Sequence, residues 1–148
     1  MKCITVLALL LYIIPTFAKN IGSSVFGLSH SKLCKLRGGS KVDAVPDTEN
    51  FDKALRDAGT KLVVVDFTAS WCMPCKMISP VFEEMSEEEE FADVVFLKVD
   101  VDEIPDITER YQVLAMPTFV FIKEGDIVER FSGASVEKLR ETLLSLLH

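Results

Sequence analysis

The sequence contains few residues of the kinds that bind transition metals. Its 148 residues include four Cys and two His, and only Cys72 and Cys75 lie close together in the chain. The remaining candidate ligands are scattered: Cys3, Cys34, His30 and His148. A closed zinc site needs about four ligands, usually from two clustered pairs. The sequence therefore argues against a zinc centre, and we expect no bound metal.

Acidic residues are absent from the first 42 positions, which carry six Lys or Arg. The rest of the chain carries 10 basic and 23 acidic residues, a net charge of −13. Because such a domain repels phosphate groups, we expect no nucleic-acid partner.

The N-terminal hydrophobic run is too short to cross a bilayer comfortably. Residues 4–14 are free of charge, Lys2 precedes them and small residues surround Ala18. This pattern favours a secretory signal at residues 1–18, with a secreted or lumenal mature form that has no membrane span. The basic, Ser-rich stretch that follows leaves a mitochondrial presequence open. A third alternative is an extension foreign to the native protein, which would leave a cytoplasmic domain.

Residues 19–41 contain scattered Gly and Ser without a sustained period, which predicts a flexible linker. Cys34 falls in this linker, either as an unengaged thiol or as a site of intermolecular disulfide formation. The domain proper is expected at residues 42–148.

Cys72 and Cys75 stand between a predicted buried strand at 61–67 and a predicted helix at 74–86. A helix N-terminus presents free N–H groups and a positive dipole, and both stabilise a thiolate. A second thiol one turn away can then close a disulfide. This arrangement favours dithiol–disulfide exchange over a purely structural disulfide, because so short a loop removes little entropy from the unfolded chain.

Buried strands alternate with helices along the domain, which predicts an α/β fold with a central mixed β-sheet flanked by helices. The predicted helix at 74–86 has an apolar face at Met77, Val81 and Met85, with Ile78 and Phe82 beside them. Glu87 to Glu90 are expected to form its solvated, frayed end, and a partner-docking patch is the alternative. The other predicted elements are a helix at 48–58, a strand at 94–99, a helix at 105–111, a hairpin at 118–122 and 127–131, and a helix from Ser135. No strand is predicted before residue 48.

Asp66 is the one acid inside the predicted strand at 61–67. If it is buried without a partner, its pKa should rise, because burial penalises the carboxylate. The alternative is an acid at the strand end that reaches water.

Five separated motifs resemble those of the thioredoxin family, over about residues 42–147. They are Val65-Asp-Phe67, Trp71-Cys-Met-Pro-Cys-Lys76, Lys98-Val-Asp-Val-Asp102, Met116-Pro-Thr-Phe119 and Phe131-Ser-Gly-Ala134. The resemblance implies the thioredoxin fold and a protein-disulfide reductase activity.

The resemblance also implies roles for four residues. Cys72 would be the exposed attacking thiolate and Cys75 the shielded thiol that resolves the mixed disulfide, so that the two form a redox-active disulfide. Asp66 would be a buried acid that helps to deprotonate Cys75, with Lys98 close to it.

The same resemblance implies a substrate-binding rim around the cysteines. Trp71 and Pro74 would belong to it, Pro117 would be a cis-proline, and the backbone of Met116 would pair with an extended substrate segment. Met73 departs from the family, which usually has Gly before the Pro, so that redox potential and substrate preference are expected to change.

The resemblance implies no cofactor. The expected partners are disulfide-containing proteins and, for recycling, a thioredoxin reductase or a low-molecular-weight thiol, with the protein acting as a monomer. Two alternatives stay open: an oxidase or isomerase in a secretory lumen, and a non-enzymatic thioredoxin-fold binding module.

Overall fold

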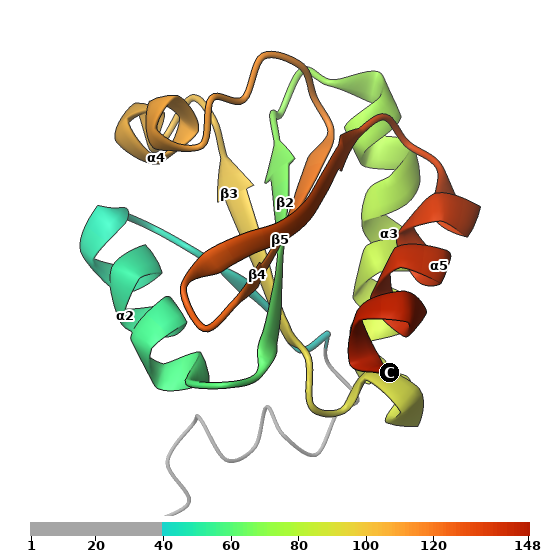
Figure 1. Ribbon diagram of the computed structural model, residues 1–148. Coiled ribbons are helices and arrows are strands. Elements are labelled where there is room, and N and C mark those ends of the chain that lie inside the picture. Colours follow the sequence, from blue (N-terminus) through green and yellow to red (C-terminus); the bar gives the residue numbers. More distant parts are fainter. Residues whose placement is uncertain (1–39) are drawn as a thin grey trace, which may run out of the picture. The chain divides into compact units, whose positions relative to one another are not determined.

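The computed structural model describes residues 40–148, which form a mixed sheet with helices on both faces (Figure 1). The strands are β1 Val42–Ala44, β2 Leu62–Thr68, β3 Val95–Asp100, β4 Thr118–Lys123 and β5 Asp126–Ser132. The helices are α2 Thr48–Ala58, α3 Met73–Glu87, α4 Pro105–Arg110 and α5 Val136–Leu147, with a 3-10 turn η2 at Glu89–Phe91. The predicted fold class is confirmed. The expectations for the signal at 1–18, for most of the linker and for Cys34 lie outside the described residues.

The sheet has the strand order β1-β3-β2-β4-β5, with β2 at its centre. β1, β3 and β2 run parallel, whereas β4 is antiparallel to both β2 and β5. Every residue of β2 is buried, as expected from its continuous apolar run. The register places Asp66 opposite Lys98 on β3 and opposite Phe119 on β4.

Two hydrophobic cores lie on opposite faces of the sheet, because successive residues of β2 point to opposite sides. Val63, Val65 and Phe67 pack on the side of α2 and α4. Leu62 and Val64 pack on the side of α3 and α5. Figure 1 shows these two layers of helices. Asp66 continues the second series and therefore points toward α3.

The strand β1 was not predicted. It is three residues long and pairs with β3 at the sheet edge, with Val42 half-buried and Asp43 and Ala44 exposed. So short an edge strand has no buried run or alternation to reveal it. What fixes it is the parallel pairing with β3, which a sequence pattern cannot show.

The predicted apolar face of α3 is partly wrong. Met85 is buried, but Met77 is 74% exposed. The buried stripe runs through Cys75, Ile78, Phe82 and Met85, so Ile78 and Phe82, expected beside the apolar series, belong to the buried face. Those spacings of three and four residues follow the helical period of about 3.6, whereas a strict spacing of four drifts off the face.

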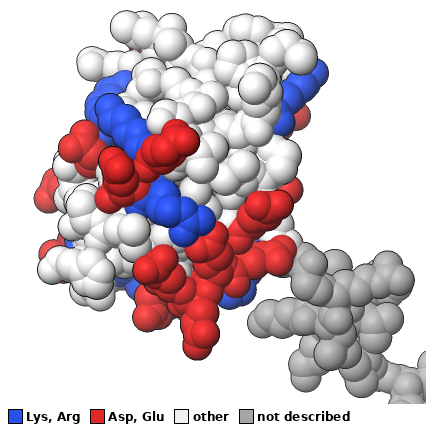
Figure 2. Space-filling view, turned by 90° about the vertical axis from the view of Figure 1, so that its right-hand side faces the viewer, with Lys and Arg blue, Asp and Glu red and all other residues white. Residues whose placement is uncertain are grey.

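The C-terminal end of α3 also differs from the prediction of a solvated, frayed end. Figure 2 views the face covered by α3 and α5 and shows acidic side chains gathered at one end of it. Glu87, Glu89 and Glu90 are exposed there, but both carboxylate oxygens of Glu88 accept hydrogen bonds from the Arg140 guanidinium on α5. These hydrogen bonds lower the pKa of Glu88. The bond ties α5 to the end of α3.

Among residues 40–148, no helix is both long enough and apolar enough to cross a membrane.

Candidate active site

Cys72 and Cys75 lie at the junction between β2 and α3, as the sequence predicts. Cys72 is the N-cap of α3, and its sulfur accepts a hydrogen bond of 3.2 Å from the backbone N–H of Cys75. The two residues form a disulfide, with their Cα atoms 5.3 Å apart. A Pro in the first turn, Pro74, costs the helix little because an N–H at that position has no partner within the helix. The turn between β2 and α3 therefore places the Cys72 sulfur next to the free backbone N–H groups at the start of α3.

In this oxidised state Cys72 is only 5% exposed and Cys75 1%, and both pack against Ala69 with Met116 alongside. The exposure predicted for Cys72 concerns its reduced thiolate and stays a prediction. The order of exposure still follows the prediction, because the first cysteine keeps the larger exposed fraction.

Asp66 is fully buried beneath this helix, and neither of its carboxylate oxygens has a hydrogen-bond partner. Burial raises its pKa from the ordinary value of 3.8 to about 7, and the positive charge of Lys98 opposes this rise. The burial and the raised pKa predicted for Asp66 are confirmed, and the alternative of an acid that reaches water is excluded. A carboxyl group with this pKa can exchange a proton near neutral pH.

Lys98 lies opposite Asp66 in the β2–β3 register but bonds elsewhere. Its ammonium donates a hydrogen bond of 2.6 Å to the Ser79 hydroxyl and lies 3.8 Å from the Glu83 carboxylate. Together with Cys75, the side chains of Ser79 and Lys98 line a cavity of about 210 Å³. This volume is large enough for several water molecules.

The loop before β4 completes the site. The Met116–Pro117 peptide bond is cis, as the resemblance implies, and Met116 packs against the cysteines. The Thr118 hydroxyl donates a 2.6 Å hydrogen bond to the carbonyl of Ala115, and the N–H of Gly133 donates one of 2.8 Å to the carbonyl of Pro117. These bonds fix the loop beside the disulfide.

Large apolar side chains are exposed around the cysteines. Trp71 is 62% exposed, and its indole N–H donates a 2.8 Å hydrogen bond to Asp102. Met73 is 65% exposed, and Pro74 is exposed as well. Leu114, 95% exposed, lines a separate groove of about 580 Å³ beside α4. Trp71, Met73 and Pro74 therefore present apolar surface next to the disulfide.

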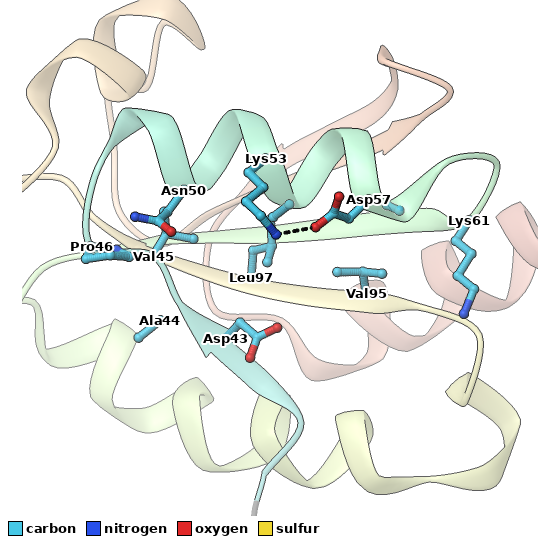
Figure 3. Close-up of a pocket in the computed structure, with 12 residues that line it drawn as sticks. Asp43, Ala44, Val45, Pro46, Asn50, Lys53, Asp57, Lys61, Val95 and Leu97 are labelled. Carbon is cyan, nitrogen blue, oxygen red and sulfur yellow. Dashed lines mark hydrogen bonds and ion pairs between the residues drawn. The ribbon is translucent and has the colours of Figure 1, made fainter. Parts of the chain in front are cut away.

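A different cavity, of about 480 Å³, lies between α2 and the strands β1 and β3 (Figure 3). An ion pair of 2.6 Å between Lys53 and Asp57 crosses its wall. Its lining contains no cysteine, so it takes no part in the chemistry of the disulfide. Within residues 40–148, no group of three or more His, Cys, Asp or Glu side chains is arranged to hold a metal ion.

The thioredoxin family model matches residues 42–145. The thioredoxin of Equus caballus is 49% identical over 106 residues, which are 72% of this chain and 99% of the horse protein. The thioredoxin of Ovis aries is 53% identical over 97 residues, 66% of this chain and 90% of that protein. The crystal structure of Nicotiana alata thioredoxin matches with a TM-score of 0.68 at 41% identity, covering 72% of this chain and 92% of that one.

The chain belongs to the thioredoxin family. Its fold and the Cys72–Cys75 disulfide agree with this membership. The protein is therefore a thiol–disulfide oxidoreductase, a dithiol–disulfide reductase of thioredoxin type. Thioredoxins act on disulfide-containing substrates and are recycled by thioredoxin reductase.

Two residues of this thioredoxin site were not found from the sequence. Ser79 and Glu83 contact the Lys98 ammonium. Their spacing offered one signal, because Ser79 lies four residues after Cys75 and Glu83 four residues after Ser79, so that each consecutive pair is adjacent on the surface of α3.

Proposed function

We propose that Cys72 attacks substrate disulfides and that Cys75 resolves the mixed disulfide. The observation that carries this assignment is the position of Cys72 at the N-cap of α3, with Cys75 one turn inside. In the first step the Cys72 thiolate bonds to one substrate sulfur, and the other substrate sulfur leaves as a thiolate. In the second step the Cys75 thiolate attacks the Cys72 sulfur, forms the internal disulfide and releases the second substrate thiolate. The substrate gains two electrons, and the protein loses them.

Asp66 would accept the proton that Cys75 loses before the second step. A base with a pKa of about 7 is poised for this transfer at neutral pH. The cavity lined by Cys75 and Lys98 has room for the water that such a transfer needs. Lys98 lies in register with Asp66 and supplies positive charge to the carboxylate once it forms.

Substrate binding would use the apolar rim and the loop before β4. We assign side-chain contacts to Trp71, Met73 and Pro74, which are all exposed beside the disulfide. The backbone of Met116, next to the cis Pro117, would pair with an extended substrate segment in the manner of an added β-strand.

Insulin-disulfide reduction in the presence of dithiothreitol tests the assignment. We expect the protein to accelerate reduction well above the dithiothreitol background and Cys72→Ser to abolish the acceleration. Cys75→Ser should accumulate a mixed disulfide with substrate, visible as a mass increase on intact-protein mass spectrometry. A wild-type rate equal to background would refute the reductase assignment and favour a binding module.

The equilibrium with glutathione tests the direction of electron flow. A reductase should hold a mostly oxidised Cys72–Cys75 pair in a glutathione buffer with a potential near −200 mV, because its own potential would be lower. A pair that stays mostly reduced in that buffer would instead support an oxidase or isomerase.

For the biological setting, we propose a secreted or lumenal protein, released from its signal after Ala18. The support is the charge and hydropathy pattern of residues 1–18. N-terminal sequencing of the protein from its native source tests this proposal. A start near Lys19 supports it, whereas a start near residue 40 favours the mitochondrion and an uncleaved protein argues against both.

We further propose that the protein acts as a monomer and is recycled by a thioredoxin reductase or by a low-molecular-weight thiol. Light scattering after size-exclusion chromatography tests the first point. Turnover with a reductase and NADPH, compared with turnover with glutathione, separates the two recycling partners.

A further inference from the structure

One side of α3 links the resolving cysteine to a pair of polar side chains. Ser79 lies four residues after Cys75 and Glu83 four residues after Ser79, so each consecutive pair is adjacent on the helix surface, and the series runs from the buried Cys75 toward solvent. The Ser79 hydroxyl accepts a hydrogen bond from the Lys98 ammonium and lies 3.4 Å from the Glu83 carboxylate, to which it can donate. The ammonium itself lies 3.8 Å from Glu83. Ser79 and Lys98 thus meet at the cavity that Cys75 lines, and Glu83 contacts both of them.

Lys98 has two carboxyl groups within its reach, and they differ in environment. Asp66 is fully buried and has no hydrogen-bond partner, whereas the Glu83 side chain is 46% exposed. The Lys98 ammonium bonds on the side of Ser79 and Glu83. An ammonium that remains at the mouth of the cavity keeps part of its hydration, and it stabilises a buried carboxylate less than one in direct contact would.

We propose that Ser79 and Glu83 are positioning residues that hold the Lys98 ammonium away from the Asp66 carboxyl. By doing so they set the pH range in which Asp66 accepts the proton from Cys75. The claim about the pH range rests on the proposed role of Asp66, which is to accept the proton from Cys75. The claim about the position of the Lys98 ammonium does not depend on that role. Ser79 serves as the bridge, because its hydroxyl accepts from the ammonium and donates to the carboxylate.

Lys98 is the one charged group that acts on the pKa of Asp66 among the described residues, and two other charged residues lie close to Lys98. Lys76 on α3 and Asp100 on β3 line the cavity together with Lys98. On β4 the residue opposite Asp66 is the apolar Phe119. The buried residues of α5 on this side of the sheet are apolar: Leu139 and Leu143. The Asp100 carboxylate accepts a hydrogen bond from the backbone N–H of Asp102, whereas the Lys98 ammonium contacts Ser79 and Glu83. The competition for Lys98 is therefore between Asp66 and the Ser79–Glu83 pair.

Glu83→Gln and Ser79→Ala test the proposal in the reduced protein. Both changes free the ammonium to approach Asp66, which favours the carboxylate. The midpoint of the Asp66 titration, followed by the carboxyl ¹³C chemical shift, should fall by about half a pH unit or more in Glu83→Gln. Ser79→Ala should lower it in the same direction. The pH profile of the resolving step, measured in single turnover, should move to lower pH with the midpoint.

Two further variants separate positioning from a general field effect. Glu84→Gln removes a neighbouring exposed carboxylate from α3 and should leave the midpoint almost unchanged. In a Lys98→Met background, Glu83→Gln should lose its effect, because there is no ammonium left to release.

Three results would overturn the proposal: an unchanged midpoint in Glu83→Gln or Ser79→Ala, an equal shift in Glu84→Gln, or a shift that persists without Lys98. The NMR titration needs no catalysis, so it separates this inference from the function itself. If the midpoints move as expected but insulin is not reduced, the positioning holds and the proposed function fails.

Discussion

Lys98 lies opposite Asp66 in the parallel pair of β3 and β2, yet the two side chains share no hydrogen bond. The ammonium bonds to Ser79, and the carboxyl group stays buried without a partner. The folded protein therefore holds an acid whose charged form is poorly stabilised. A reductase can use such an acid as a proton acceptor near neutral pH, but the arrangement costs stability when the acid ionises.

The first prediction concerns the stability of Asp66→Asn. The folded protein binds the Asp66 proton up to about pH 7, whereas the unfolded chain releases it near pH 3.8. The protonated Asp66 therefore makes its full contribution to the free energy of unfolding below pH 3.8. That contribution is lost as pH rises through about 7. Each unit of pKa difference between the folded and unfolded states is worth about 1.4 kcal/mol. The rise of the Asp66 pKa from 3.8 to about 7 on folding therefore lowers the free energy of unfolding at pH 8 by up to about 4 kcal/mol. Urea denaturation should show Asp66→Asn to be more stable than wild type at pH 8 by up to that amount.

The difference between Asp66→Asn and wild type should shrink toward zero at acidic pH, where both side chains are neutral. The matched control is Asp126→Asn at the exposed start of β5, where we expect a change below about 0.5 kcal/mol at every pH. A gain in Asp66→Asn that did not vary with pH would contradict the burial of a titrating acid.

The second prediction concerns the reactivity of the reduced cysteines. The N–H groups of the first turn of α3 favour a thiolate at Cys72, whereas Cys75 is 1% exposed within the helix. At pH 7, iodoacetamide should label Cys72 severalfold faster than Cys75 and faster than free cysteine. Peptide mapping after timed quenching measures both rates. Labelling of Cys72 at the rate of free cysteine would remove the basis for its role as the attacking thiolate.

The sequence predicts those parts of the fold that depend on local pattern. The continuous apolar run at residues 61–67 predicts the buried strand β2, and the cysteine pair after it marks the start of α3. The isolated acid Asp66 within that run already indicates a raised pKa. Each of these signals lies within a few residues of the feature that it predicts.

Other features depend on contacts between distant segments and leave little trace in the sequence. β1 exists because it pairs with β3, about 50 residues further along the chain. In the sequence Glu88 is one of four consecutive acids, and only the packing of α5 brings Arg140 to it. Lys98 resembles an ordinary surface cation until the sheet register sets it opposite Asp66. Such partners are fixed by strand pairing in the sheet and by the packing of helices on it, neither of which a single sequence shows.

The third prediction concerns Met73, where family members usually have Gly. Its side chain is 65% exposed on the rim and can bury apolar surface against a substrate. Met73→Gly should raise KM for a protein substrate roughly fivefold, because about 1 kcal/mol of apolar contact is lost. Because the cysteines stay in place, kcat should change less. Steady-state kinetics with insulin measure both constants.

The matched control for Met73→Gly is Val128→Ala on the edge strand β5, which removes a 42% exposed apolar side chain away from the rim. It should leave KM unchanged. Circular dichroism checks that the Gly variant keeps its helix content, since Gly at the start of α3 costs at most about 1 kcal/mol. An equal rise of KM in both variants would show that Met73 makes no specific substrate contact.

The fourth prediction concerns the bond between Arg140 and Glu88, which ties α5 to the end of α3. The guanidinium donates to both carboxylate oxygens and lies 5.6 Å from the centre of the Phe91 ring. Both side chains are about one-third exposed, so solvent screening keeps the value of the pair near 1 kcal/mol. Arg140→Met should lower the melting temperature by about 4 °C at pH 7. Lys53→Met, which breaks the exposed pair with Asp57 on α2, should cost only about 0.3 kcal/mol.

The pH dependence of Arg140→Met separates the ion pair from simple packing. Arg140 lowers the pKa of Glu88 below its ordinary value of 4.5, so the pair stabilises the fold above that pH. Its contribution is lost as pH falls through the lowered pKa of the folded state. The gap between wild type and Arg140→Met in thermal unfolding should therefore narrow at acidic pH and in high salt. A gap of the same size at pH 7 and pH 2 would mean that Arg140 stabilises α5 through its contact with Phe91, because only the charge pair with Glu88 disappears in acid.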